Sequence, residues 1–277
     1  MYPLSDGKTL EEKKGYDLSM NDVHLRKRFQ TPMLKGILFL AIGVLIFFVV
    51  YIPQAAILSI MHTDLLTALY FIFEHGVLDT CFIIAAFSFT SAMLMRKATP
   101  ADLCLVQFPF INDQLTSWWR RPAPRLLLQV FSLALVIVGV FVLLLTQDQW
   151  NNLLHSTFKL AAPVNDLGLP ALLQYKPVAF GVEVFVLCLL APFAEEVLFR
   201  GFLFQWLARR LGLWTGILVS SFLFAVFHWN LFGFANSFLL GIFAALLLRA
   251  SRSLWPAIAL HALWNVLFVL FALGVLH

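Results

Sequence analysis

Hydrophobic residues occur in long runs along the chain, and most polar residues are concentrated in the short segments between those runs. A helix that crosses a bilayer needs about 20 predominantly apolar residues, and such runs recur from residue 34 almost to the C-terminus. The pattern predicts an all-α fold, a polytopic transmembrane helical bundle with seven to eight spans. The candidate spans are 34–52, 65–95, 126–145, 177–208, 213–230, 231–248 and 254–275.

Two of these runs, 65–95 and 177–208, are too long for one straight crossing. A helix of about 32 residues extends about 48 Å, whereas the hydrocarbon core of a bilayer is about 30 Å thick. Each run must therefore tilt, bend or leave the bilayer. Pro192 predicts a bend in the second run, because proline lacks the backbone N–H and clashes with the preceding turn.

The distribution of Lys and Arg indicates how the chain crosses the membrane, because cytoplasmic loops carry an excess of both. With the N-terminus in the cytoplasm, all but three of the 19 Lys and Arg residues fall on the cytoplasmic side. The exceptions are Lys159 and Lys176 on the outer side and Arg200 inside the membrane. We therefore predict a cytoplasmic N-terminus. This arrangement places His228, near the end of the run 213–230, close to the outer face.

The same pattern divides the chain into four parts. Residues 1–32 are polar, lack the features of a signal peptide and are expected to form a cytoplasmic tail. Residues 33–145 are expected to form the N-terminal transmembrane helices, with a cytoplasmic loop at 96–125. An outer loop is expected at 146–176, and a C-terminal helical bundle, which carries the candidate chemistry, at 177–277.

Composition narrows the class of protein further. Hydrophobic residues make up 61% of the chain and charged residues 12%, whereas soluble domains have about 45–50% and about 25%. The net charge of +4 comes from basic residues spread between apolar runs, so we expect the lipid bilayer and no nucleic acid as a partner. Cys81, Cys104 and Cys188 have no CxxC spacing, which supports neither a disulfide framework nor a cysteine zinc site.

Three charged residues, Glu195, Glu196 and Arg200, interrupt the apolar segment AEEVLFRGFL. An ionisable side chain costs roughly 2.5–3.5 kcal/mol at the centre of a membrane helix, and it therefore indicates a functional site or a structural ion pair. Glu196 and Arg200 are spaced i,i+4, which lets them pair on one helix face. Glu195 points about 100° away from that face. Because it has no partner on its own helix, Glu195 is a candidate general base.

His228, His261 and Asn265 are further polar residues expected within the C-terminal bundle. Taken singly, each is explained by a hydrogen bond between helices. Taken with Glu195, they place a carboxylate, two imidazoles and an amide on three separate helices, and such groups gain most by meeting in a common wet cavity. A carboxylate and an imidazole can deprotonate water, and an imidazole and an amide can donate to the oxyanion of a peptide carbonyl. The set therefore favours peptide hydrolysis.

Three ordered motifs in this region resemble those of a known family. EEVLFR matches EExxxR, FAVFH matches FxxxH, and HALWN matches HxxxN, while FLLGIF resembles a weaker glycine-containing motif. Over residues 177–277 the chain resembles the CAAX protease and bacteriocin-processing (CPBP) family of intramembrane endopeptidases, which is related to the type II CAAX prenyl endopeptidase. The N-terminal half matches only as generic membrane spans.

The resemblance implies a role for each motif residue. Glu195 would activate a water with His228, and His261 and Asn265 would form the oxyanion hole. Glu196 with Arg200 would be the supporting pair. The substrate would be a membrane-associated protein or peptide, reached through a cavity open to the cytoplasm, and we expect the protein in a bacterial plasma (inner) membrane.

The family has been described both as metalloproteases and as glutamate-dependent proteases without metal. We favour a glutamate-type endopeptidase with no cofactor, because the HExxH motif is absent from the sequence. Zinc is the alternative. It requires that Glu195 and both histidines, from separate helices, face one point.

A second polar cluster, Glu74, His75 and Asp79, lies in the run 65–95 and belongs to none of the family motifs. His75 and Asp79 are spaced i,i+4, which predicts a local bond; a substrate gate or a proton path are the alternatives. The cluster supports a rival hypothesis, a proton-coupled transporter, although the chain lacks the inverted repeat common in transporters. A third hypothesis is a catalytically inactive membrane regulator.

Overall fold

The computed structural model describes residues 30–46, 62–94, 97–105, 122–160 and 168–276. Helices account for most of these residues and none of them forms a strand, which confirms the all-α prediction. The labelled elements are α3 (Asp64–Leu94), η2 (Pro100–Leu103), α5 (Pro122–Phe158), α6 (Leu169–Tyr175), α7 (Pro177–Phe185), η3 (Val186–Leu190), α8 (Ala191–Glu196), η4 (Val197–Phe204), α9 (Gln205–Leu211), α10 (Leu213–Phe227), α11 (Phe234–Ser251) and α12 (Trp255–Ala272).

Five helical segments of the described chain are long and apolar enough to cross a membrane. They are Asp64–Leu94, Phe131–Phe158, Pro177–Leu211, Phe234–Ser251 and Trp255–Ala272, and two shorter apolar helices are Gln30–Ile46 and Leu213–Phe227. The protein is therefore an integral membrane protein. The count of seven to eight spans and the cytoplasmic N-terminus stay predictions, and nearly all of the expected tail lies outside the described residues.

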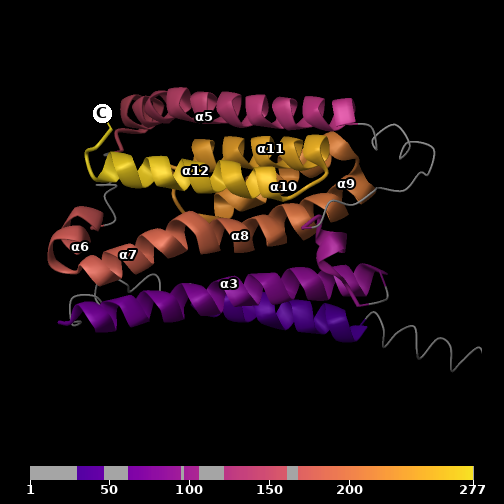
Figure 1. Cartoon of the computed structure of the whole chain (residues 1–277), viewed down its shortest axis with the longest axis horizontal. Helices are drawn as coiled ribbons and strands as arrows, with labels where there is room; N and C mark the ends of the chain where they lie inside the picture. The colour runs from indigo at the N-terminus through magenta and orange to yellow at the C-terminus, as the bar shows by residue number, and fades with distance from the viewer. Residues whose placement is uncertain (1–29, 47–61, 95–96, 106–121, 161–167, 277) are drawn as a thin grey trace, which may run out of the picture.

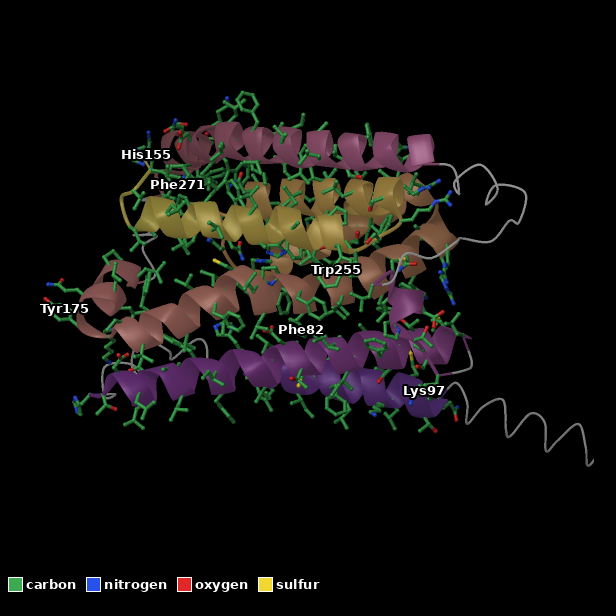
Figure 2. The ribbon with its side chains drawn as sticks, in the orientation of Figure 1. Phe82, Lys97, His155, Tyr175, Trp255 and Phe271 are labelled. Carbon is green, nitrogen blue, oxygen red and sulfur yellow. The ribbon has the colours of Figure 1, made fainter. Side chains whose placement is uncertain are left out.

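The helices run side by side, roughly along the long axis of the molecule (Figure 1). α11 packs against α5, α10 and α12, while α3 packs against α7, α8 and η4. The path from α7 through α9 crosses obliquely between α3 and the group formed by α5, α11 and α12 (Figure 1). His155 and Tyr175 lie at one end of the bundle and Lys97 lies toward the other (Figure 2). The segment that carries Glu195 is thus enclosed from both sides.

The segment expected as an outer loop is partly helical. α5 continues to Phe158, and α6 follows at Leu169–Tyr175. Polar bonds to the α11 region hold the extension of α5: Asn236 bonds to the Gln147 side chain and accepts from the Thr146 hydroxyl at 3.1 Å. The Trp150 indole N–H donates to the Leu231 carbonyl at 2.8 Å. These side chains break the apolar run without ending the helix, so hydropathy alone places the helix end too early.

Pro192 does not interrupt the path from Pro177 to Leu211, which is 35 residues long. The turn before it, η3, is a π-helix, and the Ala191 N–H donates to the Val186 carbonyl, five residues back. A second π-helix, η4, follows α8. The wider turn accommodates a residue without an N–H, so the predicted bend takes the form of a change in helix register.

α10 is short, and its end determines where His228 lies in the fold. The helix has 15 residues and is about 22 Å long, less than the roughly 30 Å of a bilayer core. His228 caps its C-terminal end, and α11 begins at Phe234. The break between the two helices thus comes at residues 228–233, close to the boundary expected between the runs 213–230 and 231–248. The expected depth of His228 near the outer face stays a prediction.

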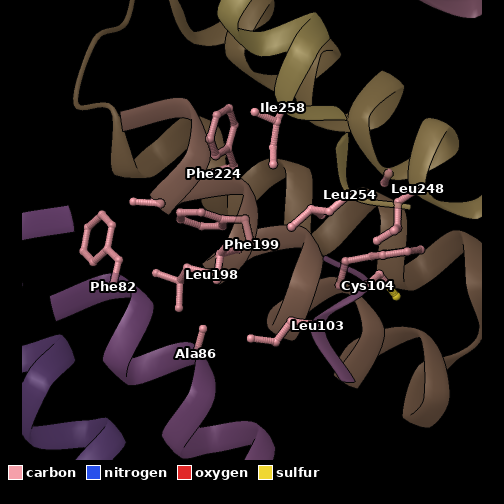
Figure 3. Close-up of a cluster of buried hydrophobic side chains, with 14 of the residues drawn as sticks. Phe82, Ala86, Leu103, Cys104, Leu198, Phe199, Phe224, Leu248, Leu254 and Ile258 are labelled. Atoms are coloured by element: carbon pink, nitrogen blue, oxygen red, sulfur yellow. The ribbon is translucent and has the colours of Figure 1, made fainter. Parts of the chain in front are cut away.

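The main hydrophobic core surrounds the charged residues of α8 and η4. It joins Phe82 of α3 and Leu103 of η2 to Phe199, Phe224 and Leu254 of the C-terminal half (Figure 3). The Phe82 ring meets the Phe227 ring edge-on at 5.3 Å. The first half of the chain therefore packs directly on the segments that carry the motif residues.

Candidate active site

Glu196 and Arg200 form the expected ion pair in the interior of the bundle. The Arg200 Nη1 donates to the Glu196 Oε1 at 2.9 Å, and both side chains are 0% exposed. The guanidinium also lies over the Phe224 ring, 4.0 Å from its centre. Because neither charge reaches water, each depends on the other for stabilisation.

Glu195 finds its partners on two other helices, as the sequence predicted. Its Oε2 lies 3.6 Å from the His228 Nε2 and 3.9 Å from the His261 Nε2. His228 caps α10 and His261 belongs to α12, so three segments distant along the chain meet here. The Glu195 Oε2 is buried and has no hydrogen-bond partner among the described residues.

The bonds on the far side of each ring define which nitrogen carries a proton. The His228 Nδ1 lies 2.8 Å from the Phe224 carbonyl oxygen, and the His261 Nδ1 lies 3.0 Å from the Glu196 Oε1. Both oxygens accept only, so each Nδ1 donates a proton to its oxygen. In a neutral ring the Nε2 then presents a lone pair. Two lone pairs and one carboxylate oxygen therefore face a common point, which suits a water, a proton or a cation.

The three side chains meet the geometric condition for a metal site. Each of Glu195, His228 and His261 offers one possible ligand atom, and these three atoms lie within 4.8 Å of one another. Two histidines and one glutamate are a known zinc donor set. The outer hydrogen bonds from each Nδ1 to the Phe224 carbonyl and to Glu196 are the kind that orient metal-bound histidines. The residues present therefore fit a zinc ion, although the sequence favoured a site without metal.

Asn265 is anchored to the helical path that leads to Glu195. Its Nδ2 donates to the Leu187 carbonyl at 2.8 Å, which ties α12 to η3. One of its two amide protons is used in this bond, and the other remains for a ligand. This bond is the contact between helices that the sequence analysis gave as the simplest explanation of an asparagine here. It does not test the proposed role of Asn265 in the oxyanion hole.

Sequence reasoning missed Phe224, which lies one turn before His228 in the FAVFH segment. Its ring is fully buried and packs 4.5 Å from the His228 ring and 5.5 Å from the His261 ring. With Arg200 on the same ring, Phe224 contacts three functional side chains at once. Its position four residues before His228 was the available signal, because residues spaced i,i+4 lie on one face of a helix.

The second polar cluster faces the path from α7 to α8. The His75 Nε2 lies 3.8 Å from the Glu183 Oε2 on α7, so among the described side chains His75 has an acidic neighbour on another helix in place of the local partner expected at Asp79. Asp79 is 7% exposed, its Oδ2 has no hydrogen-bond partner within the described chain, and its carboxyl lies within electrostatic range of Glu195. The Glu74 side chain falls outside the described part of the structure.

Comparison with known proteins was consistent with the motif resemblance. Residues 177–267, about a third of the chain, match the family described as type II CAAX prenyl endopeptidase Rce1-like. The matched segment contains Glu195, Glu196, Arg200, His228, His261 and Asn265. No curated protein and no solved structure matches the chain. The C-terminal bundle, over residues 177–267, is therefore similar in sequence to the Rce1-like family of type II CAAX prenyl endopeptidases.

Proposed function

We propose that this protein is an intramembrane endopeptidase that hydrolyses a peptide bond in a membrane-associated protein or peptide. The observation that carries the proposal is the meeting of the Glu195 carboxylate with the His228 and His261 imidazoles inside an apolar bundle. Ionisable groups at such depth are costly, and three of them converging from separate helices fit a reaction centre better than packing. We further infer a location in a bacterial plasma membrane.

The first step is removal of a proton from a water. The Glu195 Oε2 and the His228 Nε2 are 3.6 Å apart, too far for a direct hydrogen bond, and both accept. A water between them can donate one proton to each. As its oxygen attacks the scissile carbonyl carbon, Glu195 takes the proton, and it later returns that proton to the leaving amine.

The negative oxygen formed at the carbonyl needs donors. Asn265 has one amide proton beyond the one bonded to Leu187, and His261 has its Nε2. Because the His261 Nδ1 donates to Glu196, the ring donates through Nε2 only when it carries both protons. Glu196 supports that cationic ring while also pairing with Arg200. In this proposal Glu196 holds the oxyanion donor in place and does not touch the substrate.

We retain a mechanism without metal, because Glu195 and His228 together suffice to deprotonate a water. If a zinc ion is bound, Glu195, His228 and His261 would hold it, and it would supply Lewis-acid polarisation of the carbonyl. Metal content of the purified protein and the effect of a chelator on cleavage decide between the two. A stoichiometric zinc ion whose removal abolishes cleavage would replace the metal-free proposal.

The decisive test compares Glu195→Gln with a matched control, Glu183→Gln. Both are nearly isosteric changes of a carboxylate on the same helical path, buried at Glu183 and 16% exposed at Glu195, and Glu183 lies outside the group of three. The purified proteins are given a farnesylated peptide with a C-terminal CAAX sequence, and the same peptide without the prenyl group. We expect Glu195→Gln to abolish cleavage and Glu183→Gln to retain it. Full activity of Glu195→Gln would remove the proposed base.

The physiological substrate requires a wider search. Comparison of membrane proteomes from cells with the unmodified protein and with Glu195→Gln should show peptides cut only by the former. The rival transporter hypothesis makes a different prediction. It expects proton-coupled uptake into proteoliposomes that is lost on substitution of Glu74 or Asp79 and kept in Glu195→Gln.

A further inference from the structure

Pro192 lies outside the motif residues, yet it stands next to a defect in helix bonding that Asn265 repairs. In the π-turn η3 each carbonyl is met by the N–H five residues later, and the Ala191 N–H bonds to the Val186 carbonyl in this way. The next carbonyl in the series is that of Leu187. The residue five positions after it is Pro192, which has no N–H to donate. The Leu187 carbonyl is therefore left without its expected backbone partner.

A buried carbonyl without a donor costs free energy comparable to a lost hydrogen bond, and deep in a bilayer water does not readily supply one. The Asn265 Nδ2 supplies the missing donor and bonds to the Leu187 carbonyl oxygen at 2.8 Å. The bond crosses from α12 to η3 and uses one amide proton of Asn265. It also restricts where the second amide proton points, because the two N–H bonds of an amide lie in one plane.

The geometry points to Pro192 as a positioning residue of the active site: by withholding a backbone N–H it reserves the Leu187 carbonyl for Asn265 and so holds the oxyanion donor in place. This inference rests on the proposed role of Asn265. It explains why the π-turn, which ends at Leu190, comes just before Glu195, since π-turns are frequent where helices carry functional groups. A regular helix would satisfy its own carbonyls and leave Asn265 without this anchor.

The test is Pro192→Ala, which restores an N–H at this position. The new N–H has two possible acceptors. It bonds to the Leu187 carbonyl if the π-turn persists, or to the Cys188 carbonyl if the turn relaxes to the α register. Either outcome displaces Asn265. We expect kcat for the reporter peptide to fall roughly tenfold to a hundredfold with KM little changed, a partial form of the 10²–10³ loss seen on removing an oxyanion donor. Pro192→Ser supplies the same N–H and serves as the second variant.

Pro177→Ala is the matched control. Pro177 also stands in the first turn of a helix on the same path, where the missing N–H would have no intrahelical acceptor. We expect its kcat and thermal stability to equal those of the unmodified protein. A double variant then separates positioning from general damage. If Pro192 acts only through Asn265, Pro192→Ala combined with Asn265→Ala should be no slower than Asn265→Ala alone.

A second measurement does not depend on activity. In protein labelled with nitrogen-15 at asparagine, the side-chain signal absent from Asn265→Ala identifies Asn265. That signal should shift in Pro192→Ala and Pro192→Ser and stay in place in Pro177→Ala. An unchanged signal, or rate losses that multiply in the double variant, would overturn the inference. If Asn265→Ala itself keeps full activity, the oxyanion role fails instead, and the signal still reports whether Pro192 positions the amide.

Discussion

The ion pair between Glu196 and Arg200 allows stability and catalysis to be separated. In Glu196→Gln the guanidinium stays 0% exposed and loses its carboxylate, which is its hydrogen-bond partner at 2.9 Å. Its Nε and Nη2 have no other acceptor among the described residues, and contact with the Phe224 ring is the main remaining compensation. Removing one partner of a buried pair costs about 3–5 kcal/mol. For a chain of this size that corresponds to a fall in Tm on the order of 10 °C.

Removing both charges should reverse most of that loss. In Glu196→Gln combined with Arg200→Met, no charge is left buried alone, and the long apolar side chain keeps much of the volume of Arg200. We expect thermal unfolding in detergent to show a Tm within a few degrees of the unmodified protein, since replacing a buried pair by apolar groups is often neutral. Peptide cleavage should stay low, because the amide oxygen at position 196 can still accept from the His261 Nδ1 but no longer carries the negative charge that supports the doubly protonated ring. A double variant as unstable as Glu196→Gln, or one with full cleavage, would refute the reasoning.

Two further variants test the packing that brings the histidines to Glu195. A Cβ at Gly241 would lie 2.8 Å from the Ser221 Cβ, so Gly241→Ala should separate α10 from α11 and lower Tm. Gly181→Ala is the control and should leave Tm unchanged, because among the described residues no atom beyond its own stretch of helix would lie within 4 Å of the new Cβ. Equal Tm values for the two variants would contradict the close approach of α10 and α11. Phe224→Leu keeps the backbone carbonyl that accepts from His228 but removes the aromatic ring that lies 4.5 Å from the imidazole. We expect the misplaced imidazole to lower kcat roughly tenfold or more. Both kcat and KM are measured on the reporter peptide. Unchanged kcat in a folded protein would show that the backbone bond alone orients the ring.

Several properties were determined by the sequence because they depend on residues close together along the chain. Apolar runs predict membrane helices, since the bilayer leaves few other structures for such a run. The pairing of Glu196 with Arg200 follows from the helical repeat, which brings residues four apart to one face. The three motifs likewise pointed, from residues alone, to the family whose model matches residues 177–267.

Other properties were decided only by the tertiary structure, because they depend on how helices pack and where they end. Hydropathy placed the break between α10 and α11 only to within a few residues, and the structure ends α10 at Phe227 with His228 as its cap. The approach of both imidazoles to Glu195 joins segments more than thirty residues apart. The bond from Asn265 to Leu187 requires both a π-turn and a neighbouring helix at the right height. Helix periodicity carries no information about these contacts between helices, because the periodicity repeats within a few residues of one helix.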